Sequence, residues 1–140
     1  MERDLKEMRQ LTTDLRSFNK SVRRAAVTKI GMIGGDEAIK VLINVVKNPH
    51  EDLIARGNAA LMLGKLGDSR AVQPLIEALN GSGFHTPLYA AQSLGKLGDN
   101  RAIMPLLRAS ECGSDKVREA ALKSLQQLGY QKESEKVLTL

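Results

Sequence analysis

Apolar residues recur at spacings of three and four along most of the chain, which is the pattern of amphipathic helices. The first run contains Leu5, Met8, Leu11, Leu15 and Phe18 and has charged residues on its other side. We therefore expect a helix over Arg3–Phe18. It stands before the repeated part of the chain, where a helix of this kind covers the open end of a stack.

An internal repeat follows this helix. The segment LGKLGD occurs at Leu63–Asp68 and again at Leu94–Asp99, 31 residues later, and the agreement continues into the residues that follow. Weaker copies include Ile30–Gly34 and Leu125–Gly129. A fixed period of this length is typical of stacked helical repeats.

The repeat predicts an all-α fold, a right-handed superhelix of about four helical hairpins behind an N-terminal capping helix. We expect one domain, 1–140, that divides into the cap, 1–20, and the repeats 21–48, 49–83, 84–113 and 114–140. The first helices are expected near Ser21–Ile33, Pro49–Leu66, Pro87–Leu97 and Asp115–Leu128. The second helices are expected near Asp36–Lys47, Ser69–Asn80 and Asn100–Ser110, and a short last one over Lys132–Leu138.

Glycine, aspartate and proline mark the ends of these helices. A glycine follows each first helix, where left-handed backbone is expected: Gly34, Gly67, Gly98 and Gly129. Asp68 and Asp99 come next and are expected N-caps. Gly31, Gly64 and Gly95 lie one turn earlier, inside the helices, and their repetition suggests close contact between backbones.

Besides Pro49, three prolines fall at or near expected helix starts. Thr86 and Pro87 form an N-cap followed by proline in the first helical position. Pro74 and Pro105 lie within about two turns of the start of a second helix. Because an interior proline removes a backbone donor, a kink or an early 3₁₀ turn is expected there.

The combined motif, V-R-x-A-A-x-x-L-G-x-L-G-D-x-R-A-V-x-P-L-I, resembles the short HEAT-like repeats of the phycobilisome-lyase type. The resemblance implies the superhelical fold. That family takes its name from enzymes that attach bilin pigments to phycobiliproteins, yet its repeats serve many unrelated roles. A related iron hydroxylase binds its metal through several His-Glu pairs, whereas this chain has one such pair, His50-Glu51.

Composition excludes some classes of protein. Cys112 is the only cysteine, so an internal disulfide and a cysteine zinc cluster are excluded, and we expect it to be a small, half-buried residue. No apolar run approaches the roughly 20 residues of a membrane span. The N-terminus is charged and lacks a signal-peptide pattern. We expect a cytoplasmic protein without membrane partners.

No catalytic motif is present, so we expect no enzymatic activity, catalytic residue, metal or cofactor. Scaffold positions repeat between copies, whereas outward positions of the second helices differ. We therefore predict a non-catalytic scaffold or adaptor whose concave face binds a protein partner through Lys40, Asn44, Gln73, Glu77, Met104 and Arg108. The mixed chemistry of this set suits a protein surface.

Three alternatives stay open. The net charge is +5, and nucleic acid could bind a basic face containing Lys40, Lys47, Arg70, Arg101 and Arg108. Arg70 and Arg101 could instead form an Asp–Arg ladder between repeats. A bilin lyase-related subunit is the second alternative. Self-association through the apolar C-terminal end, with Val137, Leu138 and Leu140, is the third.

Overall fold

The computed structural model describes residues 2–130, with side chains from Asp4 onward. All regular structure in that range is helical, which confirms the all-α repeat fold. The elements are α1 (Glu2–Asp14), α2 (Lys20–Ile33), α3 (Gly35–Lys47), α4 (Leu53–Leu66), η1 (Ser69–Ala71), α5 (Val72–Ala78), α6 (His85–Leu97), η2 (Asn100–Ala102), α7 (Ile103–Cys112) and α8 (Asp115–Gln127).

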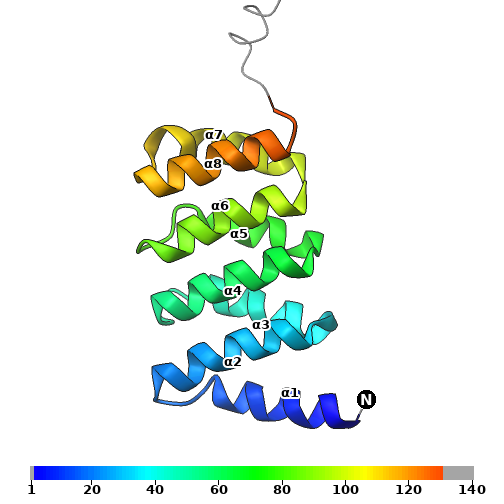
Figure 1. Ribbon diagram of the computed structural model, residues 1–140. Helices are drawn as coiled ribbons and strands as arrows, with labels where there is room; N and C mark the ends of the chain where they lie inside the picture. Colours follow the sequence, from blue (N-terminus) through cyan, green and yellow to red (C-terminus); the bar gives the residue numbers. More distant parts are fainter. Residues whose placement is uncertain (1, 131–140) are drawn as a thin grey trace, which may run out of the picture.

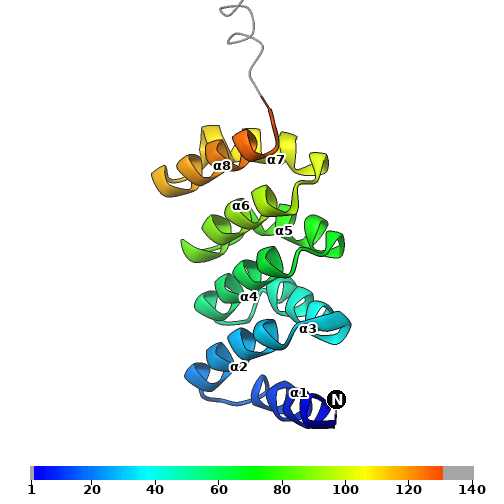
Figure 2. The ribbon, with the colours of Figure 1, turned by 45° about the vertical axis from the view of Figure 1, so that its right-hand side comes forward.

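The helices form two layers. The first helices of the hairpins, α2, α4, α6 and α8, lie side by side in one column, with α1 against α2 at the N-terminal end (Figure 1). The second helices, α3, α5 and α7, form the layer behind (Figure 2). The core lies between the layers and includes Leu42, Leu63, Leu75, Leu94 and Leu106, all 0% exposed.

Small residues let the first helices approach one another. A Cβ atom added to Gly64 would lie 2.9 Å from the backbone Cα of Ser93 in the next first helix. A Cβ atom at Gly31 would instead meet the side chain of Met62, and one at Gly95 the side chain of Ser124. A side chain at these glycines would overlap the neighbouring helix. Glycine is therefore kept inside a helix, despite a cost of about 1 kcal/mol in helix propensity, because it lets two repeats pack closely.

The predicted turns between first and second helices are confirmed. Gly67 and Gly98 have φ of 71° and 70°, in the left-handed region. Asp68 accepts a hydrogen bond from the backbone N–H of Arg70 at 2.8 Å, and Asp99 accepts one from Arg101 at 2.9 Å. The 3₁₀ turns η1 and η2 follow, so Pro74 and Pro105 lie in the first turn of α5 and α7.

Two helix boundaries differ from the prediction by four residues each. Helix α1 ends at Asp14, four residues before Phe18, because Asn19 takes extended backbone and caps α2 through the N–H of Ser21. Phe18 is left fully exposed. Helix α4 begins at Leu53 and not at Pro49, since the side chain of Asp52 caps it.

Two residue assignments were also wrong. Thr86 does not cap α6, which begins at His85. It is buried, and its hydroxyl donates to the carbonyl of Leu53 at 3.4 Å, because the start of α6 packs against α4. Cys112 is exposed, as the last residue of α7. The expected helix over Lys132–Leu138 and the apolar C-terminal end lie outside the described residues.

Candidate functional site

The six residues predicted to bind a partner all lie exposed on the second helices. They come in pairs one turn apart: Lys40 and Asn44 on α3, Gln73 and Glu77 on α5, and Met104 and Arg108 on α7. We call this set the second-helix face. Met104, the one apolar residue of the six, is 62% exposed. Its role in binding stays a prediction.

Carboxylates pair with cations along one edge of this face. Arg70 donates to Asp68 of its own turn at 3.0 Å and to Asp36 of the preceding repeat at 2.7 Å. Lys40 also pairs with Asp36, at 3.0 Å. The hydrogen bond from Arg70, followed by that from Lys40, lowers the pKa of Asp36. Arg101 pairs with its own Asp99 at 2.9 Å. Three cations named for nucleic acid are therefore paired with carboxylates.

Two further ion pairs join α2 to the start of α4. Arg24 binds Asp52 through two hydrogen bonds, of 2.6 and 2.8 Å, and Arg23 binds Glu51 at 3.0 Å. The Arg24 hydrogen bonds lower the pKa of Asp52 to about 2. Since Asp52 also caps α4, this contact fixes both the helix start and its position against the preceding repeat.

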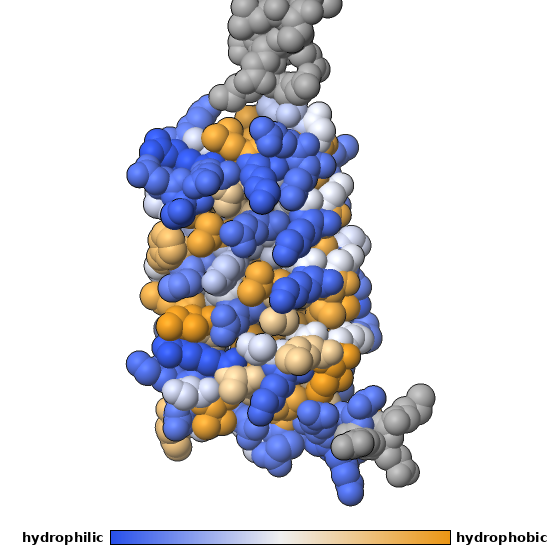
Figure 3. All heavy atoms as spheres, viewed as in Figure 1, coloured by the Kyte–Doolittle hydropathy of each residue, from blue (hydrophilic) through white to orange (hydrophobic). Residues whose placement is uncertain are grey.

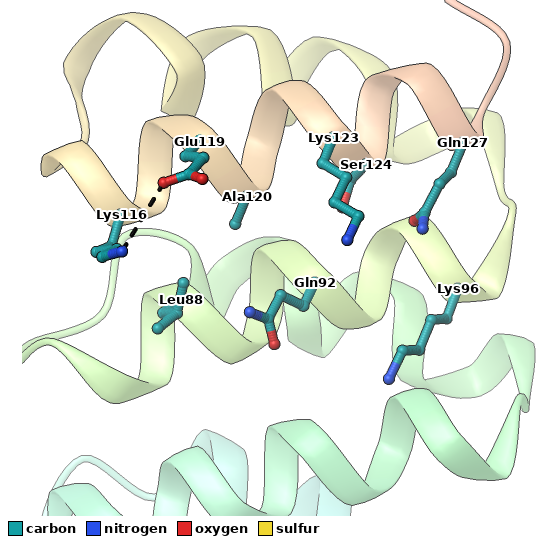
Figure 4. Close-up of a pocket in the computed structure, with 9 residues that line it drawn as sticks. All are labelled: Leu88, Gln92, Lys96, Lys116, Glu119, Ala120, Lys123, Ser124 and Gln127. Atoms are coloured by element: carbon teal, nitrogen blue, oxygen red, sulfur yellow. Dashed lines mark ion pairs between the residues drawn. The ribbon is translucent and has the colours of Figure 1, made fainter.

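A groove of about 440 Å³ lies between α6 and α8, on the side of the first helices (Figure 4). It is lined by residues of these two helices alone: Leu88, Gln92, Lys96, Lys116, Glu119, Ala120, Lys123, Ser124 and Gln127. Its volume falls within the roughly 300–1,000 Å³ of small-molecule sites. Sequence analysis missed this groove.

A comparison of equivalent residues explains why the groove opens in this pair of helices. Tyr89 of α6 lies against Gly57 of α4, since a Cβ atom at Gly57 would be 3.2 Å from the tyrosine ring. In the next pair, 31 residues on, Ala120 stands where Tyr89 stood, and Leu88 stands where Gly57 stood. The methyl of Ala120 is smaller than the ring of Tyr89, so it fills less of the space between α6 and α8.

The lining of the groove is cationic with an apolar floor. Leu88 and Ala120 supply apolar surface, while three lysines and one glutamate supply charge. Lys116 is 4.0 Å from Glu119 at one end. The side chain of Lys123 extends from α8 toward α6, and that of Lys96 leaves α6 on the side away from α8 (Figure 4). Lys123 therefore brings positive charge into the space between α6 and α8, whereas Lys96 does not.

The first-helix side also carries exposed apolar residues away from the groove. Hydrophobic side chains gather along its left edge in Figure 3, over the N-terminal ends of α4 and α6, where Leu53, Ile54 and Phe84 are exposed. His85 is the first residue of α6, and its ring packs edge-on against that of Phe84, with 5.4 Å between the ring centroids. His50 is exposed in the turn before α4. Within residues 2–130, no three metal-ligating side chains come together, and no helix could cross a membrane.

Two family profiles match the chain. The profile of HEAT repeats matches residues 8–83, more than half of the sequence. The chain belongs to the HEAT-repeat family. Within this HEAT-repeat protein, the profile of the PBS lyase HEAT-like repeat matches residues 87–112, which cover most of α6 and all of α7. The resemblance drawn from the LGKLGD motif is thus confirmed.

Solved structures give a more specific likeness. The HEAT-repeat protein is similar to a chain in the complex of CpcE and CpcF of phycocyanin lyase from Nostoc sp. PCC7120, with 28% identity and a TM-score of 0.74. The match covers 87% of this chain and 53% of that chain. This protein therefore spans about half the length of its structural neighbour. No curated protein gives a significant match to the HEAT-repeat chain.

These findings correct one expectation. We expected a chain without an enzymatic role, but both the lyase-type repeat and the lyase neighbour relate the HEAT-repeat protein to a lyase. They favour the lyase-related alternative over a pure scaffold. The prediction had relied on the absence of a catalytic motif, whereas the likeness to a lyase rests on the repeats.

Proposed function

We propose that this HEAT-repeat protein is a bilin lyase-related subunit that works together with a partner protein. Structural likeness to a chain of the phycocyanin lyase complex, over 87% of this chain, is the observation that carries the proposal. The match of the PBS lyase HEAT-like repeat to residues 87–112 supports it independently. The substrates of this class are a bilin pigment and a phycobiliprotein.

The partner is expected to be a protein, because the neighbour was solved as a complex of CpcE with CpcF. We propose the second-helix face as the surface that meets it. Its residues combine amide, thioether and both signs of charge, and Met and Arg are enriched at protein interfaces. Paired cations such as Arg70 leave less positive charge free for phosphate.

Affinity capture of the tagged full chain from cells of its source tests this function. We expect the captured material to contain a second HEAT-repeat protein together with a phycobiliprotein subunit or a bilin, read by mass spectrometry and visible absorbance. A colourless preparation that lacks both kinds of protein would show that the lyase-related assignment is wrong. Captured nucleic acid, removed by added salt, would support the nucleic-acid alternative instead.

A further inference from the structure

The N-terminal ends of the first helices α2, α4, α6 and α8 lie along one edge of the stack, at the left in Figure 1. One equivalent position in each copy stands at this edge, as the first residue of the helix or the residue directly before it. In chain order these residues are Lys20, Leu53, Phe84 and Asp115, which are 33, 31 and 31 residues apart. We call this row of four residues the first-helix edge.

Contacts between successive helices make the first-helix edge continuous. The ion pair of Arg24 with Asp52 holds the start of α4 against α2. A Cβ atom at Gly83 would lie 2.9 Å from the side chain of Leu53, so the residues before α6 touch the first residue of α4. Residues near the starts of α6 and α8 line the same groove. Because packed helices lie about 8–10 Å apart, the edge is roughly 25–30 Å long.

The middle of the first-helix edge is apolar. Leu53 and Phe84, with Ile54 next to Leu53 in the chain, are between 38% and 48% exposed. The two ion pairs between α2 and α4 neutralise the carboxylates beside these residues. Grouped apolar side chains on a surface usually mark a contact with another molecule.

The two ends of the first-helix edge carry opposite charges. Lys20 stands at one end and Asp115 at the other, and both are exposed. Asp115 also pairs with Arg118 of its own helix, but its side chain is 91% exposed, so its carboxylate has room for a second cation. The edge therefore presents a cation, two apolar residues and an anion, in that order.

A row of this kind is complementary to itself. When a second copy is turned end for end about a two-fold axis between α4 and α6, each Lys20 faces Asp115 of the other copy. Each Leu53 then faces Phe84 of the other copy, near the axis. A two-fold contact requires the same surface on both subunits, and the first-helix edge meets this requirement in both charge and apolar character.

We propose that the first-helix edge pairs with the same edge of a second copy of this chain to form a two-fold dimer. This contact goes beyond the lyase-related function and does not depend on it. An edge one or two side chains wide forms a small interface, below about 1,200 Å² in total. Interfaces of this size hold weak, reversible complexes, so we expect a dissociation constant of about 10–100 µM.

The row provides matched variants for the test. Phe84→Asp places a carboxylate in the apolar middle of the edge. Lys20→Glu makes both ends acidic, and the combination of Lys20→Glu with Asp115→Lys restores opposite charges in reversed order. Met32→Asp is the control, because Met32 is 77% exposed at the C-terminal end of α2, away from the edge. The charge variants keep the proposal testable if Phe84→Asp does not fold, which circular dichroism and thermal unfolding would reveal.

The experiment is sedimentation equilibrium of the full chain over about 1–500 µM, a range that brackets the expected dissociation constant. We expect a monomer–dimer equilibrium in wild type and in Met32→Asp, with constants within about twofold of each other. Phe84→Asp should weaken the dimer at least about tenfold, because two unpaired carboxylates would be buried in the contact. Lys20→Glu should weaken it at least about threefold, since the symmetry repeats each exposed ion pair. The combined charge variant should return to within about twofold of wild type.

Four results would overturn the proposal. A chain that stays monomeric over the whole range would reject self-pairing, and loss of the captured HEAT-repeat partner in Phe84→Asp would then assign the edge to that partner. A dimer that neither Phe84→Asp nor Lys20→Glu weakens would place the contact elsewhere, such as at the C-terminal end. A combined charge variant no tighter than Lys20→Glu alone would reject the pairing of Lys20 with Asp115. Assemblies that grow beyond the dimer would indicate head-to-tail packing in place of a two-fold contact.

Discussion

Single glycines set the distance between neighbouring repeats. Replacing Gly64 with alanine would improve the helix propensity of this position by about 1 kcal/mol. The added Cβ atom, however, would overlap Ser93 of the next first helix. We predict that Gly64→Ala destabilises the protein by about 1–3 kcal/mol, the usual range for overpacking. Urea unfolding measures this. The adjacent exposed variant Lys65→Ala should stay within about 0.5 kcal/mol of wild type, and a stabilised Gly64→Ala would refute the packing account.

The pair formed by Arg24 and Asp52 gives stability a pH dependence. The pKa of Asp52 falls from 3.8 to about 2 in the folded protein, chiefly through the hydrogen bonds from Arg24. A carboxylate whose pKa is lower in the folded than in the unfolded protein stabilises the fold at pH values above its unfolded pKa. That stabilisation is lost as the pH falls through the folded pKa. The contribution is thus full above pH 3.8 and lost toward pH 2.

Asp52→Asn isolates this effect, because asparagine is also a good N-cap but carries no charge. We predict that the variant is less stable than wild type by about 1 kcal/mol at neutral pH. The difference should shrink below pH 3.8 and close near pH 2. Unfolding free energies of both proteins across that range provide the measurement. A difference that stays constant with pH would mean that the ion pair contributes nothing.

At the scale of elements, the first helices are joined by a repeated hydrogen bond. The buried hydroxyl of Ser93 donates to the carbonyl of Ala60 at 2.7 Å, and Ser124 does the same to Ala91 at 2.6 Å. We predict that Ser93→Ala costs about 1 kcal/mol, the usual net value of a hydrogen bond. Ser110→Ala is the control, since Ser110 bonds within its own helix and should cost less. Thermal or chemical unfolding that finds equal costs would argue against a stacking role.

The helices themselves were largely predictable from sequence, because periodicity, glycine and aspartate act locally. Gly67, Asp68 and Pro74 each marked a turn that the structure contains. Thr86 was misassigned because its environment is set by Leu53 of another repeat, which local rules do not include. The boundary at Asp14 was missed for a local reason, since the apolar period was extended through Phe18.

The groove illustrates what sequence reasoning left out. It depends on two side chains that differ from the preceding repeat, Ala120 in place of Tyr89 and Leu88 in place of Gly57. Both differences were visible in the aligned copies. Their consequence required knowing that these positions face each other across neighbouring first helices. The second-helix face, by contrast, followed from helical period and from the positions that differ between copies, and its six residues are exposed as expected.

At the scale of the whole molecule, the second helices form one layer, and the second-helix face that they carry is proposed to bind a protein. We predict that Met104→Asp with Arg108→Glu reduces partner capture at least about tenfold, since a few central residues carry most interface energy. Both residues are exposed, so helicity and melting should stay close to wild type. Unchanged capture by this variant would remove the second-helix face from the account.

Covalent attachment of a bilin to an apo-phycobiliprotein subunit tests the lyase-related claim most directly. The purified chain, alone and with its captured HEAT-repeat partner, is mixed with bilin and acceptor, and pigment fluorescence is measured on the denatured acceptor over time. We predict that the chain with its partner raises the rate at least about tenfold over spontaneous attachment, because binding both reactants removes much of the entropy cost of their encounter. A rate equal to the spontaneous one in every combination would contradict the account.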